Sequence, residues 1–404
     1  MFGWLGQLLR VNLTSGVVKA EPLEPNVARM YLGGRGLATF LYAKEVPASA
    51  EPLSDANDLV FATGPLTGTL APTGGRLIIV TKCRSTGGIT AASIAGGWGA
   101  ELKFAGFDAI IFHGKASEPV FLWIENGLAT LRAAKHLWDK TAQEATLVVR
   151  QETSARAKVC SIGSPGENGD WLGVIASGDS AGVPGAGIGA VMGFKNLKAV
   201  AVSGSQGMRV AAPEDFLAAT MNTRAKIAAM PITCNGLKFE DHVLLAEGVS
   251  QDTSASNSEA ALPRGCFSCC ARFSSFRVGD EQLRLTGHAG MQPHPQHRAT
   301  GFTSQPVGGT YAPTEHSGCN INGYLILPRI VRYDGPPNVD CPGLWQALTA
   351  IADSAVLCPY SLAALDAADI GALLSTATGF TYSMDEVLRT GERILEVSRG
   401  AASG

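Results

Sequence analysis

The sequence predicts an α+β protein in which a β-rich first half precedes a mainly helical second half. Short apolar runs of β type recur through residues 1–207 and are separated by Gly, Pro and Thr turns. From Ala212 onward, segments with helical character replace them. The 404 residues suffice for two or three domains, and 48 glycines suit a large core with tight turns. We expect a β-rich domain over residues 1–210 and a mainly helical region over residues 211–404.

Six strands and two helices are predicted in the first half. A helix is expected over residues 97–105 and another over residues 139–152, where Ala142, Ala145, Val148 and Val149 share a face. The strands are the apolar runs at residues 59–62, 77–80, 109–112, 120–123, 172–175 and 199–202.

Four helices are predicted in the second half. Pro213 is followed by Glu214 and Asp215, and acidic residues are favoured in the first turn of a helix by its dipole. Ser383 is a candidate N-cap of the last helix. Residues 248–312 are rich in Ser, Gly, Pro and His, which indicates a flexible segment or the place of a trimmed domain. The other three helices are expected over residues 342–358, 361–376 and 384–398.

The bulk composition excludes several classes of partner. The net charge of −3 gives no basic excess for nucleic acid or anionic lipid. No apolar run is long enough to span a membrane, and the residues after Met1 lack the pattern of a signal peptide. We therefore expect a cytoplasmic protein. Its nine cysteines, an odd number, favour free thiols or metal ligands over disulfides.

A tight group of cysteines and one distant cysteine predict an iron–sulfur site. Cys266, Cys269 and Cys270 lie together, and Cys358 follows about ninety positions later, five residues after Asp353. Four thiolates must converge to hold one [4Fe–4S] cluster. Two alternatives stay open, namely buried free thiols and a zinc site.

The glycine-rich stretch at residues 182–193 is a weak match to a nucleotide-binding loop. Gly187, Gly189 and Gly193 miss the G-x-G-x-x-G spacing by one residue, and no P-loop lysine follows. Consecutive backbone N–H groups in such a stretch can still form an anion site.

Several phrases, in order along the first half, resemble one known family. They are Gly33–Leu37, Thr63–Thr69, Pro72–Arg76, Gly99–Ile110, Gly166–Asn168 and Gly189–Ala199. On these phrases the chain resembles the N-terminal domain of the aldehyde:ferredoxin oxidoreductases, the tungsten or molybdenum bis-pterin enzymes. A looser match runs from Gly318 to Arg399.

The resemblance implies a fold, a reaction and partners. It implies twisted β-sheets that carry the pterin, with largely helical domains closing over it. It implies oxidation of a small aldehyde to a carboxylic acid, with electrons leaving through a [4Fe–4S] cluster to ferredoxin or a small iron–sulfur subunit. A homodimer or a hetero-oligomer is the implied assembly.

The resemblance also implies residues of the pterin site. Arg76 matches the arginine that contacts a pterin phosphate, which a guanidinium binds with two parallel hydrogen bonds. Ser93, three residues before Gly96, replaces an Asn of the loop that helps to hold magnesium between the phosphates. The phosphate loop would contain Gly185, Gly187 and Gly189.

The second half would supply a pterin contact and the cluster. Asp353 and Leu357 match a pterin-binding Asp-x-x-Gly-Leu phrase, in which Val356 replaces the glycine and adds bulk. The implied cluster ligands are Cys266, Cys269, Cys358 and, by rearrangement, Cys270.

The chain departs from the family pattern at several positions. The third cluster cysteine is Phe273, the histidine of proton transfer aligns with Val307, and both arginines of the phosphate loop are replaced. The first Asp-x-x-Gly-Leu phrase is absent. We assign no catalytic residue, and two other functions stay open. One is a non-catalytic relative that serves as a cofactor-binding or assembly partner of a longer paralogue, and the other is a zinc-stabilised structural protein.

Overall fold

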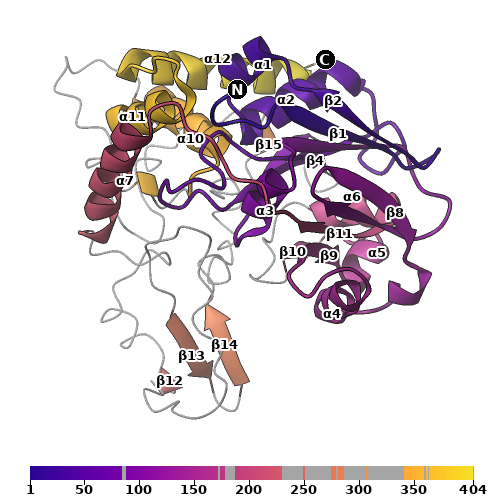
Figure 1. Cartoon of the computed structure of the whole chain (residues 1–404). Helices are drawn as coiled ribbons and strands as arrows, with labels where there is room; N and C mark the ends of the chain where they lie inside the picture. The colour runs from indigo at the N-terminus through magenta and orange to yellow at the C-terminus, as the bar shows by residue number, and fades with distance from the viewer. Residues whose placement is uncertain are drawn as a thin grey trace.

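The computed structural model describes most of the first half of the chain and the C-terminal helices (Figure 1). The described residues are 1–83, 88–171, 173–177, 187–229, 249–250, 274–278, 281–285, 306–307, 341–358, 361–362 and 364–403.

The first half forms two mixed sheets, and the larger one also contains a strand from the second half, β15. The seven-stranded sheet has the order β15-β5-β4-β3-β6-β1-β2, and only its β1–β6 pair is parallel. Its strands are β1 (Gln7–Asn12), β2 (Val17–Pro22), β3 (Leu59–Ala62), β4 (Leu77–Lys82), β5 (Ile89–Ile94), β6 (Ala109–His113) and β15 (Pro306–Val307). The five-stranded sheet contains β10 (Ile175–Ser177), β9 (Lys158–Ile162), β11 (Leu197–Ser203), β7 (Val120–Glu125) and β8 (Leu128–Ala133), in that order.

Helices and a small third sheet complete the described elements. The third sheet contains β12 (Val249–Ser250), β13 (Ser274–Val278) and β14 (Glu281–Leu285). The helices of the first half are α1 (Pro25–Tyr31), α2 (Gly34–Glu45), α3 (Trp98–Phe104), η1 (Lys135–Leu137), α4 (Ala142–Glu152), α5 (Ser164–Glu167) and α6 (Ile188–Phe194). Those of the second half are α7 (Pro213–Ala228), α10 (Cys341–Ala355), α11 (Ala367–Thr378) and α12 (Met384–Ser403).

The central strands are buried on both faces, and alternate side chains enter different cores. In β4, Leu77 and Ile79 belong to the cluster between the two sheets, whereas Ile78 and Val80 belong to the cluster under the helices. This follows from the two-residue period of a strand. Strands of this kind appear as continuous apolar runs in a sequence, which is why β3, β4 and β6 could be predicted.

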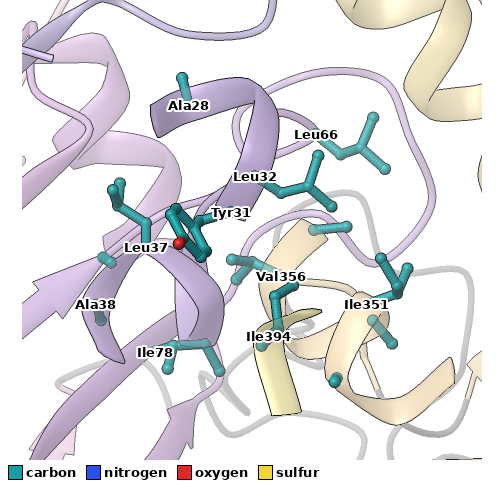
Figure 2. Close-up of a cluster of buried hydrophobic side chains, with 14 of the residues drawn as sticks. Ala28, Tyr31, Leu32, Leu37, Ala38, Leu66, Ile78, Ile351, Val356 and Ile394 are labelled. Atoms are coloured by element: carbon teal, nitrogen blue, oxygen red, sulfur yellow. The ribbon is translucent and has the colours of Figure 1, made fainter. Parts of the chain in front are cut away.

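One hydrophobic cluster joins the two halves of the chain (Figure 2). Leu32 and Leu37 come from the first half, and Ile351, Val356 and Ile394 come from the C-terminal helices. All five side chains are fully buried. The seven-stranded sheet and helices α2, α10 and α12 therefore share one core.

A buried ion pair fixes the N-terminal segment to this sheet. Lys103 and Asp108 have fully buried side chains and form a salt bridge. The Lys103 ammonium also donates to the carbonyl of Gly3, and the Asp108 carboxylate accepts from the N–H groups of Leu5 and Gly6. Burial lowers the pKa of Lys103, and the Asp108 charge opposes that shift.

The predicted fold class is confirmed, and most predicted elements lie near their expected positions. The strand predicted at 172–175 is wrong in position, because β10 begins only at Ile175. The helix predicted at 342–358 ends at Ala355, and the helix predicted at 361–376 begins at Ala367. Ser383 accepts a hydrogen bond from the Glu386 N–H, as its predicted N-cap role requires.

In the part of the chain that the structure describes, no helix has the length and apolar character needed to cross a bilayer.

Candidate functional site

Arg76 is a buried cation at the start of β4. The residue is 1% exposed, and its Nε atom donates to the hydroxyl of Ser93 on β5 at 2.7 Å. A second donor, Nη2, lies 3.3 Å from the Ser93 carbonyl oxygen. The pairing of β4 with β5 sets Ser93 opposite Ile78, which brings it within reach of Arg76. Among the described residues, the salt bridges include none to Arg76. A buried guanidinium of this kind suits an anionic ligand.

Cys358 lies beside the same arginine. Its thiol sulfur is 3.9 Å from Nη1 of Arg76, although 282 positions separate the two residues. The Cys358 N–H donates to the Thr73 hydroxyl at 3.1 Å. The sequence-predicted phosphate contact and the sequence-predicted fourth cluster ligand are therefore neighbours in space.

Asp353 and Arg35 form the second half of the site. Nη1 of Arg35 lies 3.6 Å from a carboxylate oxygen of Asp353, and the side chains are 8% and 14% exposed. Arg35 lies in the first turn of α2 and Asp353 in the last turn of α10. The two helix ends meet because Gly34 has no side chain there. A Cβ at Gly34 would overlap the Asp353 carbonyl oxygen and lie 2.7 Å from Val356 Cγ2.

Burial dominates the protonation of Asp353. It raises the pKa of this carboxyl to about 6, although the nearby charges of Arg35 and Arg76 act in the opposite direction. Because the folded-state pKa lies above the usual 3.8, the folded state keeps a proton that the unfolded chain has already lost. Ionised Asp353 therefore lowers the stability of the ligand-free protein, and such perturbed groups gather at functional sites.

We expect Asp353→Asn to stabilise the ligand-free protein in a pH-dependent way. Below pH 4 both proteins carry a neutral group there. As the pH rises from about 4 to 7, wild type loses about 2–3 kcal/mol relative to the variant, since one pKa unit corresponds to about 1.4 kcal/mol. Urea unfolding at several pH values measures this difference. A difference that is flat with pH would contradict the assignment.

Backbone strain is concentrated around these four side chains. Six non-glycine residues in the described part have positive φ, and three of them are the Asn and Asp residues that tolerate it. The others are Leu32 (φ 60°), Thr73 (φ 62°) and Val356 (φ 62°). Leu32 precedes the Gly33–Gly34 pair, Thr73 binds the Cys358 N–H, and Val356 follows α10. Strained residues cluster where the surrounding structure holds a functional geometry.

Val356 follows the last residue of α10 and has a left-handed backbone conformation. The Leu357 N–H donates to the Ala352 carbonyl at 2.8 Å, which is the bond pattern that closes a helix when the intervening residue is left-handed. The Val356 side chain is fully buried in the cluster shared by both halves, with Cγ2 directed toward Gly34. The bulk added by this valine therefore enters the hydrophobic core.

We expect Val356→Gly to be more stable than Val356→Ala by about 1 kcal/mol. Both variants lose the two γ-methyl groups, and glycine loses the Cβ as well, but alanine keeps the left-handed strain, which outweighs burial of one carbon, and glycine does not. Within a helix the order would be reversed. Denaturant midpoints of the two variants give the sign directly, and greater stability of the alanine variant would contradict the left-handed assignment.

The remaining sequence-predicted residues have different surroundings. Gly96 follows β5 with φ of 105°, which favours glycine. A Cβ at Gly187 would lie 2.8 Å from the Trp171 carbonyl oxygen, and one at Gly189 would lie 2.6 Å from Gly173. Close backbone packing at both positions therefore excludes a larger residue. The Leu357 side chain is 1% exposed and belongs to the shared cluster.

Part of the predicted site lies outside the described residues. Those residues are Gly185, Cys266, Cys269 and Cys270. Phe273, which replaces the third cluster cysteine of the family pattern, also lies outside the described residues. In the described part of the chain, no three His, Cys, Asp or Glu side chains gather as a metal site would require.

Arg35 and Thr73 are site residues that we did not predict from the sequence. Both lie in phrases that carried the family resemblance, beside paired glycines at positions 33–34 and 74–75. A polar residue next to paired glycines could have indicated both positions, because glycines let a backbone approach another element closely.

The fold of this chain is shared with a solved structure. The structure resembles the active site complex BamBC of benzoyl coenzyme A reductase in complex with 1,5-dienoyl-CoA, with a TM-score of 0.74. The likeness covers 100% of this chain and 90% of that one at 19% sequence identity, so it shows the fold.

The family follows from two sequence models. The aldehyde ferredoxin oxidoreductase N-terminal domain matches residues 8–204, and domains 2 and 3 of the same family match residues 250–401. The chain belongs to the aldehyde ferredoxin oxidoreductase family, and the resemblance inferred from the sequence is confirmed.

Three relatives show how the chain compares in length. It is 42% identical to the tungsten-containing aldehyde ferredoxin oxidoreductase of Pyrococcus furiosus over 247 residues, which are 61% of this chain and 41% of that protein. It is 28% identical to the Pyrococcus abyssi protein of the same name, over 99% of this chain and 88% of that protein. The WOR-like subunit of an aliphatic sulfonate oxidoreductase of P. furiosus is 37% identical over 51% of this chain and 35% of that subunit. The alignment at 42% identity thus spans about two fifths of the length of the P. furiosus aldehyde ferredoxin oxidoreductase.

Proposed function

We propose that the protein is a pterin-dependent oxidoreductase that converts an aldehyde into a carboxylic acid and passes the electrons to ferredoxin or a small iron–sulfur subunit. The observation that carries this proposal is the contact of buried Arg76 with Cys358, 3.9 Å apart. A phosphate-binding cation and a cluster-binding thiol in contact would bring an organic cofactor close to an electron exit.

The residues present fit a phosphorylated pterin at one end of the site. Arg76 has no carboxylate partner among the described salt bridges, and its environment is dry, which favours an anionic phosphate. Asp353 offers a carboxylate that can accept hydrogen bonds from the N–H groups of a pterin ring. A bound tungsten or molybdenum pterin would supply the two-electron chemistry, and the chain would bind, orient and shield it.

A magnesium ion fits less well at Ser93. Both the hydroxyl and the carbonyl oxygen of Ser93 accept from the guanidinium of Arg76. A second cation at the same oxygens would be repelled by the first. This arrangement suits a phosphate at Arg76 better than a metal ion at Ser93.

We expect Arg76→Met to lose the cofactor. Removing the cation leaves a phosphate without its charge partner in a dry site, which weakens binding by at least about 2 kcal/mol, or thirtyfold. The full chain would be purified without air, and tungsten, molybdenum, iron and released pterin would be counted per polypeptide. Arg10→Met is the matched control, because Arg10 pairs with Glu21 and Glu45 at the surface.

The outcomes of that experiment decide whether Arg76 holds the cofactor. Metal and pterin in wild type and in Arg10→Met, but not in Arg76→Met, support the proposal. Wild-type protein that carries neither tungsten nor molybdenum would end the enzymatic claim.

A non-catalytic role is the second candidate, favoured by the sequence at the cluster and the phosphate loop. Phe273 replaces one cluster cysteine, and both loop arginines are replaced. In that case the chain would bind cofactor for a longer paralogue. Copurification with such a paralogue would support this role, and aldehyde-dependent dye reduction by the isolated chain would exclude it.

A further inference from the structure

Arg35 is a buried cation that the proposed cofactor contacts do not use. The residue is 6% exposed, and its Nε atom is buried with no hydrogen-bond partner among the described residues. An unpaired buried donor is unfavourable by about 1–3 kcal/mol. The helix junction therefore does not satisfy every donor of Arg35.

The one charged partner of Arg35 among the described salt bridges is Asp353, at 3.6 Å. The glycines on both sides of Arg35 make this approach feasible. A Cβ at Gly34 would overlap the Asp353 carbonyl oxygen, and one at Gly36 would overlap the Tyr31 carbonyl oxygen. The local sequence thus places the Arg35 backbone against the end of α10, where its side chain can reach the carboxylate.

The same junction has a neutral neighbour for comparison. The Ser354 hydroxyl accepts from the Gly36 N–H at 3.0 Å and donates to the Ala350 carbonyl at 2.6 Å. This side chain also joins α10 to α2, and it is fully buried. Ser354 therefore provides a contact of purely structural character one residue from Asp353.

We propose that Arg35 is the positioning residue for Asp353, holding its carboxylate ionised and aligned for the hydrogen-bond donors of the bound cofactor. This inference rests on the proposed function, in which Asp353 contacts the pterin. Arg35 acts through Asp353 and supplies the positive charge on the α2 side, whereas Arg76 supplies it on the side of β4. Burial of an ionised carboxylate without such a partner would favour its neutral form, which accepts fewer hydrogen bonds.

The first test measures protonation and needs no cofactor. The full chain would be expressed without tungstate or molybdate, and urea unfolding would be followed from pH 4 to pH 8 for Arg35→Met and Arg35→Met/Asp353→Asn. The stability difference between these two proteins should begin near pH 4, as it does for the wild-type and Asp353→Asn pair, because the unfolded chain sets that limit. We expect the pH at which the difference stops growing, which marks the folded-state pKa of Asp353, to lie about one unit higher than for the wild-type and Asp353→Asn pair. Ser354→Ala, with and without Asp353→Asn, should lower stability and leave that pH unchanged. An unchanged pH in Arg35→Met would overturn the proposal.

The second test measures the pterin retained by protein expressed with metal. Arg35→Met should retain at least about tenfold less pterin than wild type, Arg35→Lys should recover most of it, and Ser354→Ala should retain it. In the Asp353→Asn background, Arg35→Met should have little further effect, because Arg35 acts through that carboxylate.

The two tests separate failure of this inference from failure of the proposed function. If wild type retains pterin and Arg35→Met retains as much, the positioning role is wrong and the proposed function stands. If wild type retains no pterin, the proposed function fails, and with it the cofactor part of this inference. The pH test then still decides whether Arg35 controls the charge of Asp353.

Discussion

Replacing Gly34 with alanine is expected to lower the free energy of unfolding by at least about 3 kcal/mol. A methyl group at this position would overlap the Asp353 carbonyl oxygen and crowd Val356 Cγ2 at 2.7 Å. The carbonyl belongs to the backbone of α10 and cannot rotate away. The start of α2 and the end of α10 must therefore separate. The residue also has φ of 39°, which adds strain for any side chain.

Gly16→Ala is the matched control. Gly16 also has positive φ, 72°, but a Cβ there would meet nothing within 4 Å. Its cost should be the backbone strain alone, about 1 kcal/mol. Urea unfolding of both variants measures the difference. Equal losses would show that the junction of α2 and α10 is not as tight as described.

Replacing Asp108 with alanine should have an effect of similar size. It would leave the fully buried Lys103 ammonium without its charge partner and free the N–H groups of Leu5 and Gly6. Removing one partner of a buried ion pair typically lowers the free energy of unfolding by about 3–5 kcal/mol. We expect Lys103→Met to be milder, because Asp108 would keep its backbone donors and methionine would fill the apolar space.

The comparison with a surface pair tests the role of burial. Lys135 and Glu118 form an ion pair at 3.7 Å with side chains 79% and 66% exposed. Glu118→Ala should change stability by less than about 1 kcal/mol. If Asp108→Ala were equally mild, Lys103 and Asp108 would have to be accessible to water in solution.

The most apolar central strands could be predicted from the sequence, whereas the interior strands β1, β5 and β9, the edge strand β2 and the first helices could not. Strands β3, β4 and β6 are buried on both faces and appear as apolar runs. Strand β2 is mostly exposed, and its sequence mixes charged and apolar residues. The helix α2 begins within a glycine-rich phrase whose composition does not favour helix, and tertiary packing against α10 and α12 determines it.

The site could be predicted only where a family phrase carried a chemically distinctive residue. Arg76, Ser93, Asp353 and Cys358 were named from the sequence, and the structure brings Arg76 into contact with both Ser93 and Cys358. The pairing of Arg35 with Asp353 joins residues 318 positions apart through two helix ends. Such a contact depends on tertiary packing, which no local pattern encodes.

The hydrophobic cluster shared by both halves has a consequence for how the chain can be divided. Leu32 and Leu37 are covered by Ile351, Val356 and Ile394, which lie more than 300 positions later. A polypeptide that stopped after β11 would leave this apolar surface open to water and to other copies, and exposed patches of that kind promote aggregation. The β-rich half is therefore not an autonomous module, and synthesis of α10, α11 and α12 completes both the fold and the arginine–carboxylate site.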